Sequence, residues 1–204
     1  MASIERRAAP GVGARTPPSA AQARIITAAV ELFGKYGVGG TSLQMIADAI
    51  GVTKAAVYHQ YRTKDEIILA AAEAEVVRVE MVLDAAEAEP SRRRRREALV
   101  AGMVDLALER RHTASTILGD PVVARLVAHH QPFQEVVDRL YRLLTGDAAK
   151  PESRVSAAML TAAISGAVMH PLVADLDNDA LRPQLLHLAR RYLDLPDQAA
   201  SPTL

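Results

Sequence analysis

A short segment around residue 55 carries side chains suited to binding a polyanion. Lys54 and Tyr58 can donate hydrogen bonds to phosphates or to base edges. Small residues at the start of the segment let the backbone approach a groove floor closely, and the methyl group of Ala55 can touch a thymine methyl. If the segment is helical, Ala56 and Val57 are expected to pack inward. The outward face would then carry Lys54, Ala55, Tyr58 and His59.

Two predicted helices and a glycine turn position this segment. The pattern predicts helices over about Leu43–Ile50 and Lys54–Tyr61, joined by a tight turn at Gly51. Ser42 can cap the first helix and Thr53 the second. Two short helices around such a turn have the spacing of a helix-turn-helix. An ordinary helical hairpin has the same spacing, so the pattern alone leaves both interpretations open.

Further helices are expected on both sides of this pair. Residues Ala21–Tyr36 have an apolar stripe of helical period, and Gly37 ends the helix that they predict. Thr63 and Glu66 have the spacing of a capping box, which starts a helix over about residues 64–89. Glycine and proline recur along the rest of the chain and divide it into about nine helical pieces, without a strand pattern. The chain is therefore expected to be all-α.

Charge is divided unevenly along the 204 residues, although the formal net charge is zero. Residues 1–64 hold eight lysines or arginines and three acids, whereas residues 65–204 hold 16 basic and 21 acidic residues. A basic head on an acidic body favours a polyanionic partner for the head. The chain has no cysteine, which excludes disulfides and thiolate sites, and no apolar run of the roughly 20 residues that span a bilayer. Since the N-terminus lacks a secretory signal pattern, a cytoplasmic protein without a membrane partner is expected.

Residues 21–70 resemble the TetR family of transcriptional regulators. The resemblance is carried by RIITAAVELFGKYG at residues 24–37 and by TSLQMIADAIGVTKAAVYHQYRTKDEI at residues 41–67. In register with the family are Leu32-Phe33, Gly37, Thr41-Ser42, Ile46-Ala47, Gly51-Val52, Tyr58-His59 and Thr63-Lys64. The sequence departs from the family at Met45, where an acidic residue usually closes a capping box, and at Gln60, where a tyrosine or histidine is usual. Tyr61 is expected to fill an aromatic position in the core.

The resemblance implies DNA-binding roles for residues of both short helices. Residues Thr41, Ser42 and Gln44 would touch phosphates, and Gln44 also a base. The major-groove face would be formed by Thr53, Lys54, Ala55, Ala56 and His59. Tyr58 and Lys64 would hold the DNA backbone. The implied organisation is a three-helix DNA-binding domain over residues 21–66 and a larger helical effector-binding and dimerisation domain over residues 67–204. Residues 1–20, rich in proline, glycine and arginine, are expected to be a flexible arm.

Residues 91–150 correspond to the part of the family that encloses an effector pocket. Apolar helices with a few polar groups suit a small, largely apolar molecule, and an ordinary core is the alternative for each residue. The candidate pocket residues are Met103, Leu106, His112, Leu126, His130, Phe133 and Met159.

Two late segments, about residues 152–170 and 178–193, are candidate dimer helices. The first is rich in small residues that permit close helix approach. The candidate interface residues are Leu160, Ile164, Ala167, Leu185, Leu188 and Tyr192. Packing within one chain is the alternative, but the resemblance favours a homodimer, because one helix-turn-helix reads too little sequence for an operator.

Two other charged motifs have ordinary interpretations. The run Arg92–Arg96 is interpreted as a solvated face neutralised by Glu87, Glu89 and Glu97, with a second phosphate site as the alternative. Glu109 and His112 have the Glu-x-x-His spacing of di-iron bundles, but the sequence has no second copy. No metal site and no cofactor are therefore expected.

Together with these patterns, the resemblance to the TetR family implies a homodimeric, ligand-responsive transcriptional regulator. It would be a repressor that a small apolar effector releases from a pseudo-palindromic operator in double-stranded DNA. One alternative is a DNA-binding adaptor whose helical body binds a protein partner. A helical-bundle enzyme is a third possibility, against which the absence of a paired acid–base or metal set argues, and no enzymatic activity is expected.

Overall fold

The computed structural model describes residues 18–111, 121–146 and 150–195. These residues form nine α-helices, one 3-10 turn and no strand, which confirms the predicted all-α class. The elements are α1 (Ala20–Gly40), α2 (Leu43–Ile50), α3 (Lys54–Gln60), α4 (Lys64–Glu87), α5 (Arg92–Glu109), α7 (Pro121–Val127), α8 (Gln131–Thr145), α9 (Pro151–Ala167), η1 (Pro171–Val173) and α10 (Asn178–Tyr192). Within the described segments, no helix combines the length and apolarity that crossing a bilayer requires.

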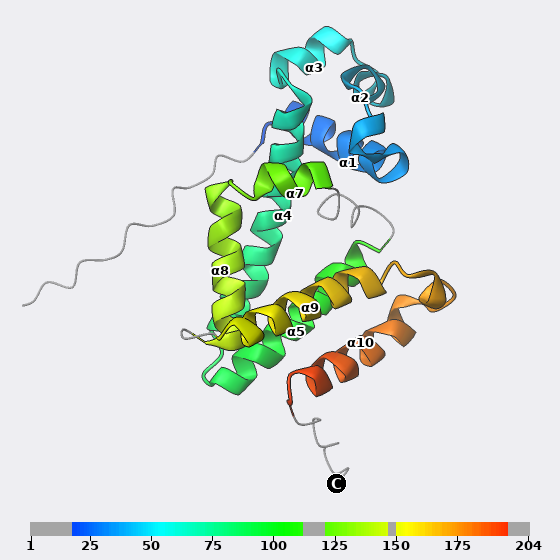
Figure 1. Cartoon of the computed structure of the whole chain (residues 1–204). Coiled ribbons are helices and arrows are strands. Elements are labelled where there is room, and N and C mark those ends of the chain that lie inside the picture. Colours follow the sequence, from blue (N-terminus) through cyan, green and yellow to red (C-terminus); the bar gives the residue numbers. More distant parts are fainter. Residues whose placement is uncertain (1–17, 112–120, 147–149, 196–204) are drawn as a thin grey trace, which may run out of the picture.

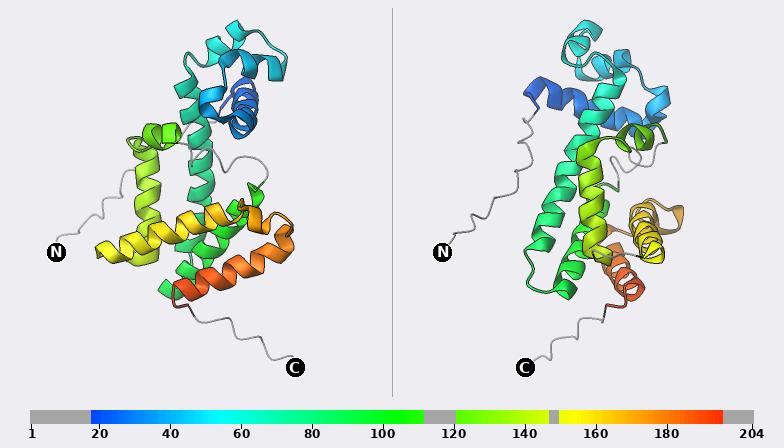
Figure 2. Two further views of the ribbon diagram at one scale, coloured as in Figure 1. Left: turned by 45° about the vertical axis from the view of Figure 1, so that its right-hand side comes forward. Right: turned by 60° about the vertical axis from the view of Figure 1, so that its left-hand side comes forward.

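The helices are arranged along α4, the long helix that joins the two ends of the molecule (Figure 1). We call α1–α3 the head and α5, α8, α9 and α10 the body. The head surrounds the N-terminal end of α4, whereas α5, α9 and α10 pack together at its C-terminal end. Figure 2 shows α8 running beside α4 and α7 lying between α8 and the head.

The head has its own apolar core, built from one face of each short helix. Ile46 and Ala47 of α2 and Val57 of α3 are fully buried against Phe33 of α1. Tyr61, just beyond α3, is also buried, which confirms its predicted place in the core. Burial of each large apolar side chain contributes about 1.5–3 kcal/mol, so this small cluster is enough to hold α3 in place. The cluster continues past residue 66 with Ile67, Ile68, Ala71 and Ala72 of α4 and Val123 and Val127 of α7.

The body core forms where α5 packs against α4, α8, α9 and α10. Leu83 of α4 and Leu99 and Val104 of α5 are almost completely buried there. The approach of α4 to α5 is close, because a Cβ at Gly102 would lie 2.5 Å from Cγ1 of Val82. A glycine at this position therefore allows the two helices to approach each other.

The arginine run at the start of α5 holds together the ends of three other helices. Arg92 Nη2 donates to the carbonyl of Thr145 (3.2 Å) at the end of α8, and Arg95 Nε donates to the carbonyl of Glu89 (2.8 Å) beyond α4. Arg96 Nη2 donates to the carbonyl of Leu193 (3.4 Å), the C-cap of α10. Cations at helix C-termini are favourable because they satisfy free carbonyls and complement the helix dipole.

The predicted neutralisation of this run is correct only in part. Arg93 Nε forms the expected ion pair with Glu97 (2.9 Å). The carboxylate of Glu87 instead binds Arg139 of α8 (2.8 Å), and Glu89 contributes its backbone carbonyl. Partial burial, with the charge of Arg92 nearby, lowers the pKa of Arg96. The run is therefore a structural contact as well as a charged face.

Candidate nucleic-acid interface

The helix-turn-helix is defined by caps at each helix end. Ser42 Oγ accepts a hydrogen bond from the backbone N–H of Met45 (3.2 Å), so α2 is capped although Met45 cannot complete a capping box. Gly51 ends α2 with φ of 69°, in the left-handed region that favours glycine. Thr53 Oγ1 accepts from the N–H of Ala56 (3.2 Å) and starts α3. The predicted N-caps and the glycine turn are thus confirmed.

The face of α3 that points away from the head core is exposed to solvent, so a ligand can reach it. Val57 is the buried residue of α3, and its side chain lies in the head core. Ala56 is exposed, so the expectation that it packs inward was wrong. Ala56 precedes Val57 directly, so the two side chains point about 100° apart around the helix axis, and it is Val57 that faces the core. The exposed residues of α3 are Lys54, Ala55, Ala56, Tyr58 and His59.

Four of these residues surround an open hollow of about 510 Å³, which is lined by Lys54, Ala55, Tyr58 and His59. The Tyr58 side chain stands out from the surface and is 54% exposed. The structure therefore brings these four predicted site residues together on one surface.

The predicted contacts of α2 are exposed but partly engaged within the chain. Ser42, Gln44 and Thr53 all lie at the surface. Gln44 Nε2 donates to Asp48 Oδ1 (2.7 Å), while the hydroxyls of Ser42 and Thr53 serve as caps. They flank α3 and are in a position to contact the same ligand.

Thr41 and Lys64 have a structural role in the head. Thr41 is only 3% exposed, and its Oγ1 donates to the carbonyl of Gly37 (2.9 Å). Lys64 Nζ donates to the carbonyls of Val38 (2.8 Å) and Thr41 (3.1 Å). Gly37 itself has φ of 74°, which bends the last turn of α1 towards these partners. Thr41 has almost no surface left for a phosphate, and Lys64 joins the end of α1 to the start of α4.

The start of α4 differs slightly from the predicted capping box. Thr63 Oγ1 accepts from the N–H of Glu66 (3.1 Å), as expected. The Glu66 carboxylate accepts from the N–H of Arg62 (2.7 Å), one residue before the cap. The cap still satisfies two free N–H groups, so α4 begins where the sequence predicted.

The sequence reasoning missed the contribution of α7 to the head. Val123 and Val127 are buried in the head core, and Phe133, at the start of α8, packs against both core clusters. His130, the N-cap of α8, places Nε2 3.1 Å from Oε1 of Glu73 in α4. An apolar stripe shows that a helix has a buried face but not which helix covers it, so no local signal identified this contact.

The candidate effector residues occupy different environments. Met103 packs partly buried against the body core, and Leu106 is buried. Leu126 and Phe133 are half-buried near the head, and His130 faces Glu73. Met159 is 58% exposed on α9, and His112 lies outside the described residues. The pocket itself stays a prediction.

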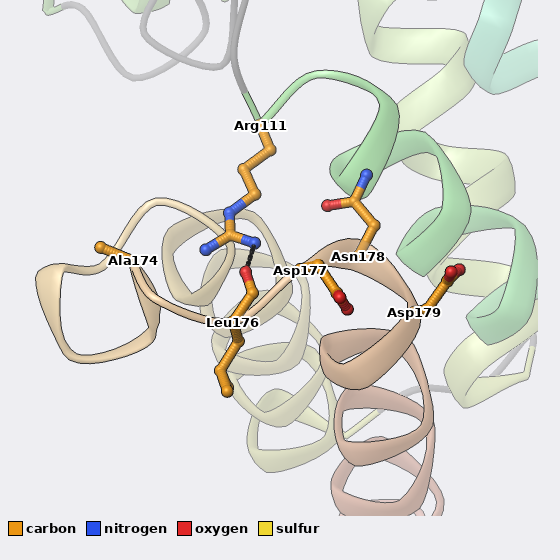
Figure 3. A pocket seen from close by; sticks show the side chains of 6 residues that line it. All are labelled: Arg111, Ala174, Leu176, Asp177, Asn178 and Asp179. Carbon is orange, nitrogen blue, oxygen red and sulfur yellow. Dashed lines mark hydrogen bonds between the residues drawn. The ribbon is translucent and has the colours of Figure 1, made fainter.

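A polar hollow of about 370 Å³ lies at the far end of α5 (Figure 3). The Arg111 guanidinium donates to the carbonyls of Val173 and Leu176 there. Asn178 Nδ2 donates to the carbonyl of Leu108 (3.4 Å), and Asp177 caps α10 through the N–H of Ala180 (2.8 Å). Its polar groups therefore mainly hold the loop before α10, and no candidate effector residue lines it.

A buried ion pair links α4 to the end of α5. Arg110 is almost completely buried and pairs with Glu75. Burial lowers the pKa of Arg110 to about 10, which leaves the guanidinium charged at neutral pH. Nearby, Glu109 pairs with Arg78 of α4 (3.6 Å). No group of three or more histidines, aspartates or glutamates in the described ranges could hold a metal ion.

The six candidate dimer residues fall on opposite faces of α9 and α10. Leu160, Ile164 and Leu185 are buried in the core of their own chain, because helical period turns them inward, and so have little surface for a partner. Ala167 is half-buried, whereas Leu188 (59%) and Tyr192 (44%) are exposed. Val155 and Met159 of α9 are exposed as well. The outer face of the two helices is thus more apolar than a solvated face requires.

Comparisons with known proteins agree with this geometry. Residues 25–71 match the family model described as bacterial regulatory proteins, tetR family. Over 49 residues the chain is 39% identical to the uncharacterized HTH-type transcriptional regulator YezE of Bacillus subtilis, and the match covers 24% of this chain and 25% of that protein. The likeness to this curated relative therefore spans about a quarter of its length.

Solved structures extend the likeness of the fold to most of the chain. A bacterial regulatory protein in the tetR family from Rhodococcus RHA1 has a TM-score of 0.70 at 21% identity, over 88% of this chain and 100% of that chain. AibR, solved in complex with isovaleryl coenzyme A and operator DNA, has a TM-score of 0.61 at 19% identity, over 82% of this chain and 97% of that chain. Residues 25–71 thus match the helix-turn-helix segment of the TetR family, and the all-helical fold of most of the chain is similar to that of a solved protein of this family.

Proposed function

We propose that this chain is a homodimeric repressor that binds a pseudo-palindromic operator through α3. A small, largely apolar effector would bind the body and release the protein from the operator. The observation that carries the proposal is the outward face of α3, where Lys54, Tyr58 and His59 stand around Ala55. The DNA major groove admits an α-helix, which phosphate contacts position and base contacts make specific.

The proposal assigns a role to each part of the chain. Residues 21–66 form the DNA-binding domain, residues 67–204 bind the effector and the second copy, and residues 1–20 add non-specific contacts to DNA. AibR, a fold relative, was solved with both operator DNA and an acyl coenzyme A, which supports a similar pairing of ligands here. A regulator of this kind works in the cytoplasm, where bacterial DNA lies.

For an effector bound in the body to release the protein from its operator, the body must be in contact with the head. The buried side chains of α7 supply such a contact, because Val123 and Val127 complete the head core while α7 leads directly into α8. Suppose that α8 can adopt two positions and that the head moves with it. An effector would shift the balance between these two conformations only if it binds one of them more tightly than the other. The partly buried Phe133, which touches both cores, is well placed to transmit such a shift.

A second copy is needed because one α3 reads only one half-site. The exposed apolar residues of α9 and α10 support an interface on their outer face. A two-fold axis there would bring the same surface of both copies together, as closed dimers require.

The test is the double substitution Lys54→Ala with Tyr58→Ala. It removes a cation and a phenol from the α3 face, and we expect affinity for a duplex selected from a random library to fall at least about a hundredfold. Fluorescence anisotropy measures the affinity. The mass of the assembly in solution should not change.

The matched control is Lys35→Ala with Tyr36→Ala. This pair removes the same residue types from α1, where Lys35 lies 5.1 Å from the Tyr36 ring centroid. It should bind the selected duplex nearly as well as the unmodified protein.

The affinity of the unmodified protein for the duplex should also decrease steeply with salt, because phosphate contacts release counterions. Undiminished binding by the α3 variant would refute the proposal.

A further inference from the structure

The hollow on α3 has an apolar floor. Lys54 with Tyr58, and Ala55 with His59, are spaced four residues apart, so the four side chains form one continuous patch on the helix. Because Ala55 has the shortest side chain of the four lining residues, we place its methyl group at the floor. The longer side chains of Lys54, Tyr58 and His59, which also line the hollow, then stand around this methyl group.

The floor offers no hydrogen-bonding group to a base. An alanine side chain is a single methyl group, and the lining residues that carry polar groups, Lys54, Tyr58 and His59, all have longer side chains. Gln60, the next residue of α3, is half-buried, and its Nε2 lies 3.4 Å from Nδ1 of His59. The polar groups of the patch therefore belong to the three side chains around Ala55, namely the Lys54 ammonium, the Tyr58 hydroxyl and the His59 ring nitrogens.

The major groove contains one apolar group that fits such a floor. Each base pair presents hydrogen-bond donors and acceptors there, but only thymine presents a methyl group, on C5. A donor or acceptor placed over the Ala55 methyl would lose its water without gaining a partner, whereas a methyl group would lose only unfavourable hydration.

We propose that Ala55 is a specificity-determining residue that reads the C5 methyl of one thymine in each operator half-site. The inference rests on the proposed function, because it requires α3 to lie in the major groove. Lys54 and Tyr58 hold the rim of the hollow against the neighbouring backbone or base edge, and Ala55 then distinguishes thymine from cytosine at the base beneath it.

The experiment starts from a duplex that the full-length protein selects from a random library. Each thymine in one half-site is replaced in turn by deoxyuridine, which keeps the base-pairing edge and the O4 acceptor and removes only the methyl group. Burial of one such group contributes about 0.8 kcal/mol, so we expect one position to lose about fourfold in affinity. The same change in both half-sites should cost about fifteenfold.

Two glycine variants connect this loss to Ala55. In Ala55→Gly the floor methyl is gone, so thymine and deoxyuridine should bind with nearly equal affinity at that position. Ala49→Gly is the matched control, since it makes the same helix-weakening change at an exposed alanine of α2 that neither lines the hollow nor belongs to the proposed DNA-binding residues. It should keep the fourfold preference. A cytosine at the position should bind weakly, and 5-methylcytosine should recover part of the loss.

The outcomes separate the inference from the function. If no duplex is selected over random DNA, the proposed function fails. If a duplex is selected but no thymine is sensitive to loss of its methyl group, or the sensitivity persists in Ala55→Gly, the inference about Ala55 is wrong while the function stands. Equal loss of the thymine preference in Ala49→Gly would also overturn the inference, because the effect would then follow the stability of the helix-turn-helix.

Discussion

At the scale of single residues, the two lysines of the helix-turn-helix region have different environments. Lys54 lies exposed on α3 at the rim of the hollow. Lys64 is half-buried and donates to two backbone carbonyls at the end of α1. Their residue type and their nearness in sequence suggest one role for both, namely contact with phosphates. The structure separates their roles, because Lys64 is bound to backbone carbonyls of its own chain, whereas Lys54 is exposed on α3.

The substitution Lys64→Met should lower the free energy of unfolding by about 2 kcal/mol, because two carbonyls lose a charged donor. The matched control, Lys54→Met, should change stability by less than about 0.5 kcal/mol and should weaken DNA binding instead. Urea denaturation followed by circular dichroism measures the first effect. If Lys64→Met unfolds at the same urea concentration as the unmodified protein, its hydrogen bonds to the end of α1 are not structural.

At the scale of elements, the helices themselves were largely predictable and their partners were not. Caps and breakers such as Ser42, Gly51 and Thr53 act within a few residues, so the start of α2 and the whole of α3 were predicted to within a residue or so. The carbonyls bound by Lys64 and Arg96 are 26 and 97 residues away along the chain. Such contacts depend on how helices pack, which hydrophobic period does not specify.

The same limit applies to the candidate site. The α3 residues could be named because residue types and family resemblance coincide on a seven-residue helix. Thr41 was named by the same resemblance, but its burial depends on the bend at Gly37 and could not be deduced from spacing. For the effector pocket, apolar residues of α5 and α8 have the same pattern whether they line a cavity or a core, so the sequence does not distinguish these alternatives.

The ion pair between α4 and α5 should be sensitive to loss of one partner. Glu75→Gln leaves the buried Arg110 charge uncompensated, and we expect a loss of about 3 kcal/mol in stability. The double substitution Glu75→Leu with Arg110→Met should recover most of it, because an apolar pair of similar size avoids the desolvation of both charges. Chemical denaturation of both variants measures the difference. A double variant no more stable than Glu75→Gln would show that the charges contribute more than their burial costs.

At the scale of the whole molecule, exposed apolar side chains gather on the outer face of α9 and α10. Met159 and Leu188 are 58% and 59% exposed, and Tyr192 OH accepts a hydrogen bond from Ser156 Oγ across the two helices (3.3 Å). Such a patch is typical of a surface that is covered in the assembled protein. The proposed interface therefore keeps Leu188 and Tyr192 from the predicted dimer residues and adds Met159 of α9.

Replacement of Met159 and Leu188 by glutamate should yield monomers at concentrations where the unmodified protein is a dimer. Four like charges would meet across a two-fold axis without water to screen them. Sedimentation velocity measures the mass. The control is glutamate at Val77 and Met81, which are exposed on α4 away from this face, and it should remain dimeric. A dimeric Met159–Leu188 variant would place the interface elsewhere.

The 24 residues of α4 extend from the head to the base of the body as one uninterrupted helix. At 1.5 Å per residue it is about 36 Å long, so a tilt of about ten degrees at its lower end would displace the upper end by about 6 Å. In a symmetric pair the two displacements add to about 12 Å, roughly a third of the distance between successive major grooves on one side of DNA. In the proposed dimer, a small rearrangement around a bound effector would therefore be enough to move both copies of α3 out of register with the major groove.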